Sequence, residues 1–472
     1  MDGGGLERLQ RALGPAADLH AVGGWVRDRW LGLEPGDLDL ATALLPHQVM
    51  ERARAAGLKA IPTGLPHGTV TVLLAGRPVE ITTFRGDGDY LDGRRPSAVN
   101  LGVALEEDLA RRDFTVNALA LPVAVLTDAD WRAQVVDPFG GRQDLQRRLI
   151  RAVGDPLARF GEDGLRPLRA CRFASQLGFA LEDATAAAIP ERLEVCAKVA
   201  AERVFAELTK LLGGREPARG LRLLEASGLL DLWLPELRPM VGCPQNRHHR
   251  FDVWEHTLKA MERALGEEPA FLWALLLHDA GKPAARSVGA DGEAHFFGHE
   301  ELSGAIADRV LRRLKASTQL RERAAAYIAL HGLHPDPAGS DRAFRRVLKR
   351  IVEAGLTPEA WMVFQLADHW GKGWFDTGHP DGRSGQAWWD ATRAEWTAAG
   401  ARLDAVRYTG MTAKELALDG TALMDLAGRP GGPWLGALQK HLLEQVLEDP
   451  ERNTASVLEE LARAWLRGGP AA

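Results

Sequence analysis

The chain has 472 residues, of which 46% are hydrophobic and 26% are charged, and its formal net charge is −6 at pH 7. This composition is typical of a globular protein and excludes a general polycation that coats nucleic acid, although a local basic surface for RNA is compatible with it. The length suggests about three domains. No apolar run approaches the roughly 20 residues of a membrane helix, and residues 1–15 lack the apolar core of a signal peptide. We therefore expect a cytoplasmic protein without a membrane partner.

Three cysteines, Cys171, Cys196 and Cys243, are far apart and show no CxxC spacing. This spacing indicates reduced thiols rather than a disulfide framework, in keeping with a cytoplasmic protein.

The first 140 residues combine helices with short runs of β-type residues. Residues 69–74 (TVTVLL) and 78–84 (PVEITTF) are rich in β-branched side chains and predict two strands, and Ala-Gly-Arg at 75–77 suits a hairpin turn between them. Beyond residue 145 the strand pattern fades into sequences rich in Ala, Leu, Arg and Glu with Gly and Pro breaks. The sequence therefore predicts an α+β fold, with a small mixed sheet in an N-terminal head followed by an extended all-α body.

Two motifs near the N-terminus combine a glycine turn with paired carboxylates. Gly23 and Gly24 stand where a strand is expected to turn into a helix, and glycine lets the backbone approach a phosphate closely. Arg27, one turn into that helix, adds positive charge to the same place. Asp37 and Asp39 are two residues apart, so on an extended strand both carboxylates point to one face, as Mg²⁺ ions that bridge a triphosphate require. Together, ahead of a hairpin, the two motifs favour a metal site over a solvated loop.

Glu80 lies in the middle of the second expected strand. Its carboxylate either faces solvent or completes the metal cluster, and the pattern leaves both alternatives open. In a two-metal site a further carboxylate positions the metal and deprotonates or orients the attacking hydroxyl.

Four segments carry a specific resemblance: GGWVRD (23–28), DLDLAT (37–42), VEITTFRGDGDYLDGRRP (79–96) and EEDLARRDFTVNALAL (106–121). Together they resemble the class II tRNA nucleotidyltransferase and bacterial poly(A) polymerase family. The resemblance implies a polymerase-β-like nucleotidyltransferase fold in which Asp37 and Asp39 bind Mg²⁺. It also implies that Gly24, Arg27 and Arg112 contact the incoming nucleotide. Residues 85–99 match the family's flexible loop, which is associated with the switch from C to A addition and tends to be absent from enzymes that add only C.

Residues 162–173 (EDGLRPLRACRF) place Asp163, Arg166, Arg169 and Arg172 at intervals of three, so that on a helix successive members lie side by side. An Asp beside an Arg offers an acceptor and a forked donor for the edge of a base. The family resemblance implies that this segment selects C and A without a template. Steps of three fall short of a turn, so Arg172 ends about half a turn from Asp163 and is expected to contact phosphate or serve structure. Pro167 is expected near the first helical turn, where it is tolerated.

Histidines are spread through a helical stretch from residue 246 to 375. His278-Asp279 follows the apolar run 271–277 and precedes Ala-Gly-Lys-Pro, and this segment resembles the HD phosphohydrolase superfamily. The resemblance implies a divalent metal site, and imidazole with carboxylate suits Mn, Ni, Co or Fe in a hydrolytic role on phosphoesters. The implied ligands are His256, His278, Asp279 and Asp368, joined by His299 and His331 in members with two metals.

Segments 411–428 and 430–446 resemble the tail of bacterial CCA-adding enzymes, which binds the elbow region of tRNA. An amphipathic helix is expected here, ending near Asp449-Pro450. Trp434 is expected in the core rather than as a stacking platform.

These observations predict four parts: a nucleotidyltransferase head (1–140), a helical neck with the nucleotide selector (141–245), an HD domain (246–375) and a helical tRNA-binding tail (376–472). The predicted function is template-independent addition of CCA to tRNA from CTP and ATP, with release of pyrophosphate and no DNA partner. The HD domain is expected to bind a metal, and the resemblance leaves two alternatives open: it adds a phosphohydrolase activity, or it only supports the RNA. An A-adding tRNA enzyme and a poly(A) polymerase remain alternatives because they share the head motifs. An HD phosphohydrolase with a tRNA-binding head is an alternative of another class.

Overall fold

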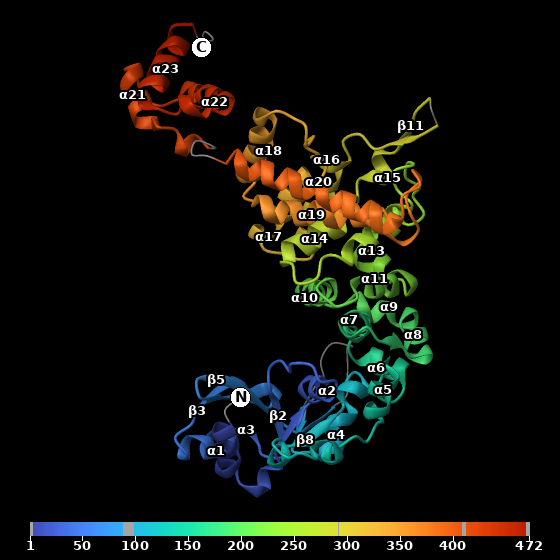
Figure 1. Ribbon diagram of the computed structural model, residues 1–472. Helices are drawn as coiled ribbons and strands as arrows, with labels where there is room; N and C mark the ends of the chain where they lie inside the picture. The colour runs from blue at the N-terminus through green and yellow to red at the C-terminus, as the bar shows by residue number, and fades with distance from the viewer. Residues whose placement is uncertain (1–2, 88–98, 291, 408–411, 469–472) are drawn as a thin grey trace. The chain divides into compact units, whose positions relative to one another are not determined.

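The computed structural model describes residues 3–87, 99–290, 292–407 and 412–468 (Figure 1). The chain forms two compact units, Met1–Pro235 and Glu236–Ala472. No helix in the described ranges is long and apolar enough to span a membrane. The division into four parts is finer than these two units and stays a prediction.

The first unit contains a mixed sheet of six strands in the order β3-β4-β5-β2-β1-β8. β2 and β5 are parallel, and every other neighbouring pair is antiparallel. The strands are β1 (His20–Val22), β2 (Asp39–Thr42), β3 (Lys59–Gly64), β4 (Thr69–Leu74), β5 (Arg77–Thr83) and β8 (Ala120–Pro122).

The two faces of this sheet differ because side chains alternate along each strand. Val79 and Ile81 of β5 are buried, and they pair with Val72 and Val70 of β4 on the same face. Helices α1 (Gly3–Leu13) and α3 (Pro46–Ala55) cover that face. Glu80 points to the opposite, open face, where the candidate site lies.

The hairpin between β4 and β5 confirms the predicted turn. Ala75 and Gly76 have φ angles of 48° and 80°, the left-handed geometry of a two-residue type I′ turn. β5 begins one residue before the predicted strand. The short strands β6 (Arg85–Asp87) and β7 (Val99–Leu101) pair with each other. The remainder of the predicted flexible loop, residues 88–98, lies outside the described residues.

Helices make up the rest of the first unit. They are α2 (Gly24–Trp30), α4 (Leu105–Ala110), α5 (Gly141–Arg147), α6 (Pro156–Glu162), α7 (Arg166–Leu177), α8 (Asp183–Ala188), α9 (Leu193–Cys196), α10 (Ala201–Leu212), α11 (Pro217–Ala226) and α12 (Leu229–Trp233). Helix α7 packs against α10 and α11, and the two-residue strands β9 (Leu149–Ile150) and β10 (Ala180–Leu181) lie near its ends. All three cysteines are buried free thiols, as the sequence predicts.

The second unit is helical apart from the two-residue strands β11 (Ser287–Val288) and β12 (Ala294–His295). Its core is α14, whose residues 270–277 are all buried and apolar, as expected for a helix packed on every side. The helices are α13 (Val253–Met261), α14 (Pro269–Leu277), α15 (Lys282–Ala285), α16 (His299–Arg313), α17 (Thr318–Leu330), α18 (Asp341–Glu353), α19 (Pro358–Gly371), α20 (Gly385–Ala405), α21 (Gly420–Ala427), α22 (Pro433–Glu448) and α23 (Ala455–Gly468).

Tryptophans join α19 to α20. Trp388 and Trp389 of α20 pack on Trp370 of α19, and the short helix η8 (Trp374–Asp376) lies in the connecting segment. In the tail, α22 ends at Glu448, close to the predicted end. Trp434 is only half-buried, with Arg429 over its ring at 4.4 Å, so its expected place in the core is wrong.

Candidate functional sites

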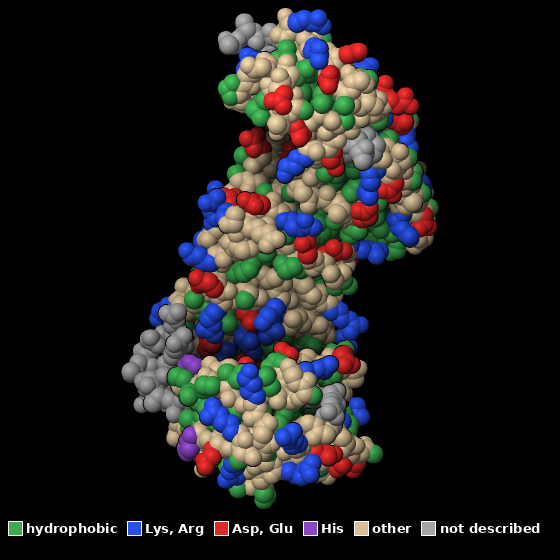
Figure 2. Space-filling model, turned by 90° about the vertical axis from the view of Figure 1, so that its left-hand side faces the viewer, with side chains coloured by type: hydrophobic (Ala, Val, Ile, Leu, Met, Phe, Trp, Pro, Cys, Tyr) green, Lys and Arg blue, Asp and Glu red, His purple; other side chains and the backbone are tan. Residues whose placement is uncertain are grey.

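The open face of the sheet forms the floor of a hollow of about 550 Å³ in the first unit. Asp39 and Glu80 lie side by side on this floor because they are partners across the parallel pair β2 and β5. The hollow is strongly basic, and the face of the molecule in Figure 2 has Lys and Arg side chains gathered around a recess. The lining arginines are Arg27, Arg85, Arg111, Arg112, Arg166, Arg169 and Arg172.

Asp37 occupies a different position from the one its spacing suggests. β2 begins at Asp39, so Asp37 lies in the bend before the strand and outside the hollow's lining. The expectation that one strand presents both carboxylates is therefore wrong, although Asp37 remains close enough to act electrostatically on Asp39. Glu80, left open by the sequence, is the carboxylate that the sheet pairs with Asp39.

The carboxylates on the floor carry excess negative charge. Partial burial raises the pKa of Asp39, Glu80 and Asp37 raise it further, and Arg112 only partly opposes them. Ionising Asp39 therefore costs free energy that a nearby cation would recover. Carboxylate oxygens with this need for positive charge fit a hard divalent ion such as Mg²⁺.

Gly23 and Gly24 form the predicted turn between β1 and α2. Gly23 has a φ of 70°, and a Cβ at this position would lie 2.7 Å from a guanidinium nitrogen of Arg112. Glycine therefore lets Arg112 lie against the turn. Arg27 donates to the Asn117 side chain at 2.6 Å, and Arg112 donates to the Asn117 carbonyl at 3.3 Å. Asn117 thus holds two of the predicted nucleotide-binding arginines at the rim.

Asp113 is a buried carboxylate that organises the wall of the hollow. It accepts bonds from Arg169 Nε at 2.8 Å and from the Asn117 side chain at 3.0 Å. Burial raises the pKa of Asp113, but Arg169 and the hydrogen bonds outweigh burial and bring it down to about 2. The charge of Arg169 is therefore paired with Asp113 and oriented by it.

The segment 162–173 is not one continuous helix. Helix α6 ends at Glu162, α7 begins at Arg166, and Asp163 lies in the break, so the expected helical spacing from Asp163 to the arginines is wrong. Pro167 is at the start of α7, as predicted. A Cβ on Gly164 would lie 2.4 Å from the Val195 carbonyl oxygen, so close backbone packing shapes the break.

Asp163 and Arg166 both line the hollow and are held by other groups. Asp163 accepts from Leu165 N at 3.0 Å and from Arg203 at 2.9 Å. Arg166 donates to the carbonyls of Arg159 and Arg111, both at 2.8 Å, and pairs with Glu162. The predicted selector pair is therefore fixed in orientation before any nucleotide binds.

Arg172 also lines the hollow, but its strongest contact is structural. Its Nε lies 2.5 Å from the Glu207 carboxylate of α10, and its guanidinium covers Phe173 at 3.8 Å. Burial and Arg169 together lower the pKa of Arg172 to about 10, and Glu207 opposes them. These contacts agree with the expectation that Arg172 serves structure or contacts phosphate rather than the base.

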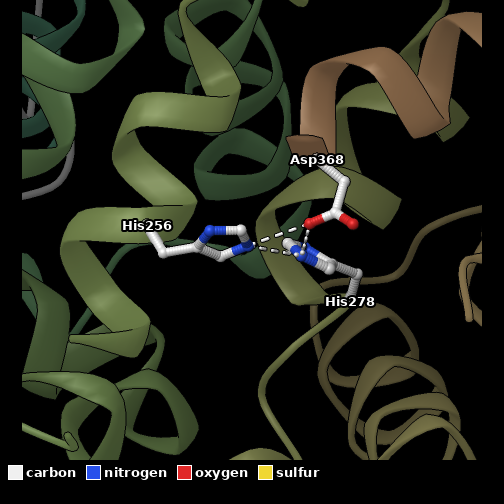
Figure 3. Close-up of side chains that lie close together, drawn as sticks. All are labelled: His256, His278 and Asp368. Carbon is white, nitrogen blue, oxygen red and sulfur yellow. Dashed lines mark hydrogen bonds and ion pairs between the residues drawn. The ribbon is translucent and has the colours of Figure 1, made fainter. Parts of the chain in front are cut away.

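A second cluster of ligand side chains lies in the second unit. His256, His278 and Asp368 converge, with His256 Nε2 at 2.9 Å from Asp368 Oδ1 and at 3.3 Å from His278 Nε2 (Figure 3). Asp279, His299 and His331 form an adjoining group. All six residues implied by the HD resemblance thus come together, from α13, α16, α19 and the ends of α14 and α17.

Asp279 joins the two groups. Its Oδ2 lies 3.3 Å from Nε2 of both His256 and His278, and its Oδ1 lies 3.5 Å from His299 Nε2. Oδ1 is also 3.6 Å from His331 Nε2. One buried carboxylate therefore faces both groups, as in a site with a bridging ligand.

Three of the histidine rings are already oriented for metal binding. Nδ1 of His278, His299 and His331 donates to the carbonyl three residues earlier, at 2.8, 2.7 and 2.6 Å. A carbonyl only accepts, so Nδ1 carries a proton and Nε2 is the ring nitrogen that faces the cluster. Burial lowers the pKa of His278, but Asp279 and Asp368 outweigh burial and raise it to about 10. A buried cluster with this need for positive charge fits a divalent cation.

Comparison with known proteins shows which class this fold and site belong to. Residues 19–151 match the poly A polymerase head domain, and residues 178–240 match the probable RNA and SrmB-binding site of polymerase A. The first match indicates the nucleotidyltransferase class for the head, and the second lies in the helical segment that follows it.

The full-length relatives are more specific. The chain is 33% identical to a CCA-adding enzyme of Geobacillus stearothermophilus over 95% of this chain and 92% of the relative. It is 34% identical to a CCA-adding enzyme of Geobacillus thermodenitrificans, over 97% and 96% of the two chains. The crystal structure of the Bacillus stearothermophilus CCA-adding enzyme in complex with CTP matches with a TM-score of 0.67 at 29% identity, covering 99% and 97%.

The chain belongs to the CCA-adding enzyme family. Nucleotidyltransferases of this family use divalent metal ions, generally Mg²⁺. Sequence reasoning found about half of the residues that line the hollow. It assigned no role to Asp113 or Asn117, nor to Glu207, which pairs with Arg172 behind the lining. Asp113 and Asn117 lie within the family motif at 106–121, which could have identified them. No sequence pattern marks Glu207, because its partner Arg172 lies on another helix.

Proposed function

We propose that the protein adds C, C and A to the 3′ end of tRNA from CTP and ATP, with Asp37, Asp39 and Glu80 as the acidic group of the active site. The pairing of Asp39 with Glu80 on the floor of an arginine-lined hollow carries this proposal. Mg²⁺ held by these carboxylates would neutralise the triphosphate and make the attacking 3′-hydroxyl more acidic. Membership in the CCA-adding enzyme family supports tRNA as the acceptor.

The arginines of the hollow bind the triphosphate. Arg27 and Arg112 lie at the Gly23-Gly24 turn, where a phosphate can approach the backbone, and Gly24 lines the same hollow. Arg169 lies on the α7 side, oriented by Asp113. Guanidinium groups fixed by carboxylates and an amide stabilise the charge on the leaving pyrophosphate without reorganising.

Asp163 and Arg166 select the base. Asp163 offers an acceptor and Arg166 a forked donor, and both are held by protein contacts at one wall of the hollow. A base with a matching edge would bond to both groups, whereas a mismatched base would leave a buried polar group unpaired. Arg172, which pairs with Glu207, supports the wall and adds positive charge to it.

The deciding experiment offers the purified protein and Mg²⁺ three RNAs: tRNA lacking CCA, tRNA ending in CC, and an unrelated RNA. Labelled CTP and ATP are given separately and together. Three additions in the order C, C, A, only on tRNA, are expected.

Other products would identify the alternatives. Addition of A alone to the tRNA ending in CC would identify an A-adding enzyme. Long A tails on any RNA would identify a poly(A) polymerase. No transfer to any RNA would contradict a catalytic head.

A second function, hydrolysis of phosphoesters, is proposed for the cluster in the second unit. The orientation of three imidazoles toward a bridging carboxylate favours it. The cluster opens into a hollow of about 380 Å³ that two lysines, Lys282 and Lys372, also line. A transition metal such as Mn, Ni, Co or Fe would activate water there, and the lysines would hold the phosphoester.

The test is hydrolysis of simple phosphoesters by full-length protein reconstituted with each metal in turn. Metal-dependent release of phosphate, or ring opening of a 2′,3′-cyclic phosphate, is expected. Tightly bound metal without turnover of any ester would leave the cluster with a structural role only.

A further inference from the structure

A smaller hollow of about 210 Å³ lies next to the histidine cluster, and nothing in the two functions above uses it. It is formed by the end of α19, the segment around η8, and one face of α20. The loop between α19 and α20 thus forms a wall of this hollow.

Lys372 lines both this hollow and the larger one that holds the cluster. Its ammonium makes no hydrogen bond or ion pair within the described residues. Burial and the charge of Lys282 lower the pKa of Lys372, and Asp368 and Glu395 only partly oppose them. An unpaired ammonium between two adjoining hollows suits an anionic group of a ligand that spans both.

The walls of the small hollow are aromatic. Trp388 and His379 have nearly parallel rings, 6° apart in plane, with centroids at 6.4 Å. Trp374 meets His379 edge-on, with centroids at 5.4 Å, and its indole donates to the His248 carbonyl. His379 is positioned by Asp381, whose carboxylate lies 3.0 Å from Nδ1. Rings fixed in this way present flat surfaces for a planar ligand.

Glu395 supplies the polar edge. It is exposed on α20, lines the same hollow, and has no hydrogen-bonding partner in the described part of the chain. A carboxylate accepts from the exocyclic amine of cytosine or adenine, which uracil lacks.

We propose that this hollow binds the base of a nucleotide whose phosphate lies at the histidine cluster, with Lys372 contacting the phosphate between them. The ligand class is a nucleoside phosphate carrying an amino-substituted base. Hydrolysis of the bound nucleotide rests on the proposed phosphohydrolase function. Binding of the base in the small hollow does not require hydrolysis.

The test uses full-length protein loaded with Mn²⁺ in an Asp39→Ala background, which removes nucleotidyl transfer. Cytidine 3′-phosphate, uridine 3′-phosphate and the base-free glycerol 2-phosphate are compared for binding by calorimetry and for hydrolysis. His379→Ala is expected to weaken cytidine 3′-phosphate binding about tenfold while leaving the KM for glycerol 2-phosphate within about twofold. Lys372→Met should raise the KM of all three esters.

Two further variants keep the result decisive. Glu395→Ala changes an exposed residue and should reduce the preference for cytidine over uridine 3′-phosphate. Trp434→Ala is the control, because Trp434 is a half-buried aromatic side chain of the same unit that lines neither hollow. Unchanged cytidine 3′-phosphate binding in both His379→Ala and Glu395→Ala, or a loss in Trp434→Ala instead, would overturn the proposal.

The two proposals can fail separately. If wild-type protein hydrolyses no ester but His379→Ala still weakens nucleotide binding, the phosphohydrolase function is contradicted and the base site is supported. If glycerol 2-phosphate is hydrolysed but no variant distinguishes the nucleotides from it, the base site alone is contradicted.

Discussion

The two units of the chain present metal ligands in opposite ways. On the sheet of the first unit, Asp39 and Glu80 are exposed carboxylates in an open hollow, surrounded by arginines. In the second unit, His256, His278 and Asp279 are almost completely buried. An open site of oxygen ligands suits Mg²⁺, which keeps waters and binds together with substrate phosphates. A buried site whose imidazoles are oriented by backbone carbonyls suits a metal that stays bound.

The first site depends mainly on the charge of its carboxylates, whereas the second depends on side chains that are already oriented. In the proposed function the first site receives a triphosphate with its ions and then releases pyrophosphate, and the raised pKa of Asp39 agrees with carboxylates that are poorly neutralised without them. In the second site, backbone carbonyls already orient the imidazoles of the proposed ligands. Removing a ligand from one site should therefore leave the other intact.

The largest expected effect follows from Asp39→Ala. Loss of this carboxylate should reduce incorporation of CTP into tRNA by about 1,000-fold or more, because the remaining acids cannot hold the ion in place. The metal content of the second unit should not change. Asp128→Ala, an exposed carboxylate outside the hollow, is the control. Near-normal transfer by Asp39→Ala would contradict the proposal that the active site lies on this sheet.

Asp279→Ala should affect only the other unit. Both ligand groups lose their shared carboxylate, so affinity for Mn²⁺ should fall by more than about 100-fold, measured by equilibrium dialysis with elemental analysis. Nucleotidyl transfer should be unchanged. The control is His47→Ala, which removes an exposed histidine outside both ligand groups and should change neither Mn²⁺ affinity nor transfer. A parallel loss of transfer would mean that the two sites are coupled.

Asp113→Asn should destabilise the first unit by about 2 kcal/mol, as expected when a buried carboxylate has its pKa lowered from 3.8 to about 2. The folded pKa lies below the unfolded one, so this stabilisation is complete above pH 3.8 and is lost as the pH falls toward 2. Urea unfolding at several pH values should show the variant's deficit shrinking in acid. A deficit that is independent of pH would contradict the ion pair with Arg169.

The smallest effect is expected from Arg203→Ala. Its ion pair with Asp163 is partly exposed, so stability should change by less than about 1 kcal/mol. Freed from Arg203, Asp163 would lose its fixed orientation, and preference for CTP over UTP should fall about threefold at unchanged kcat. Glu216→Ala, which removes a comparable exposed pair with Arg219, is the control. Unaltered nucleotide preference would mean that Asp163 is positioned without Arg203.

Local patterns predicted the hairpin of the sheet, β4 and β5, but not β3 or β8. Alternating β-branched residues identified β4 over its full length, and the glycine pair marked the turn into α2, because both features depend on neighbours in sequence. The position of Asp37 was mistaken, since the start of β2 is set by its pairing with β1 and β5 rather than by the Asp-x-Asp spacing.

Long-range contacts set the limits of prediction. The break between α6 and α7 depends on packing of Gly164 against Val195, thirty-one positions along the chain, so the sequence suggested a continuous helix. The six proposed ligands of the histidine cluster come from five separate elements, and only the family resemblance, not their spacing, connected them. The ion pair of Arg172 with Glu207 and the position of Lys372 between two hollows depend in the same way on tertiary packing.

The contact at Gly164 also limits how this enzyme can change. Any side chain there would bring a carbon atom to 2.4 Å from the Val195 carbonyl oxygen, and the loop carrying Asp163 would have to shift away. In the proposed function, nucleotide choice would therefore change more readily through the side chains at 163 and 166 than through the backbone that carries them. Libraries designed to retarget the enzyme to other nucleotides should keep position 164 constant, and natural variation should be sought around it rather than at it.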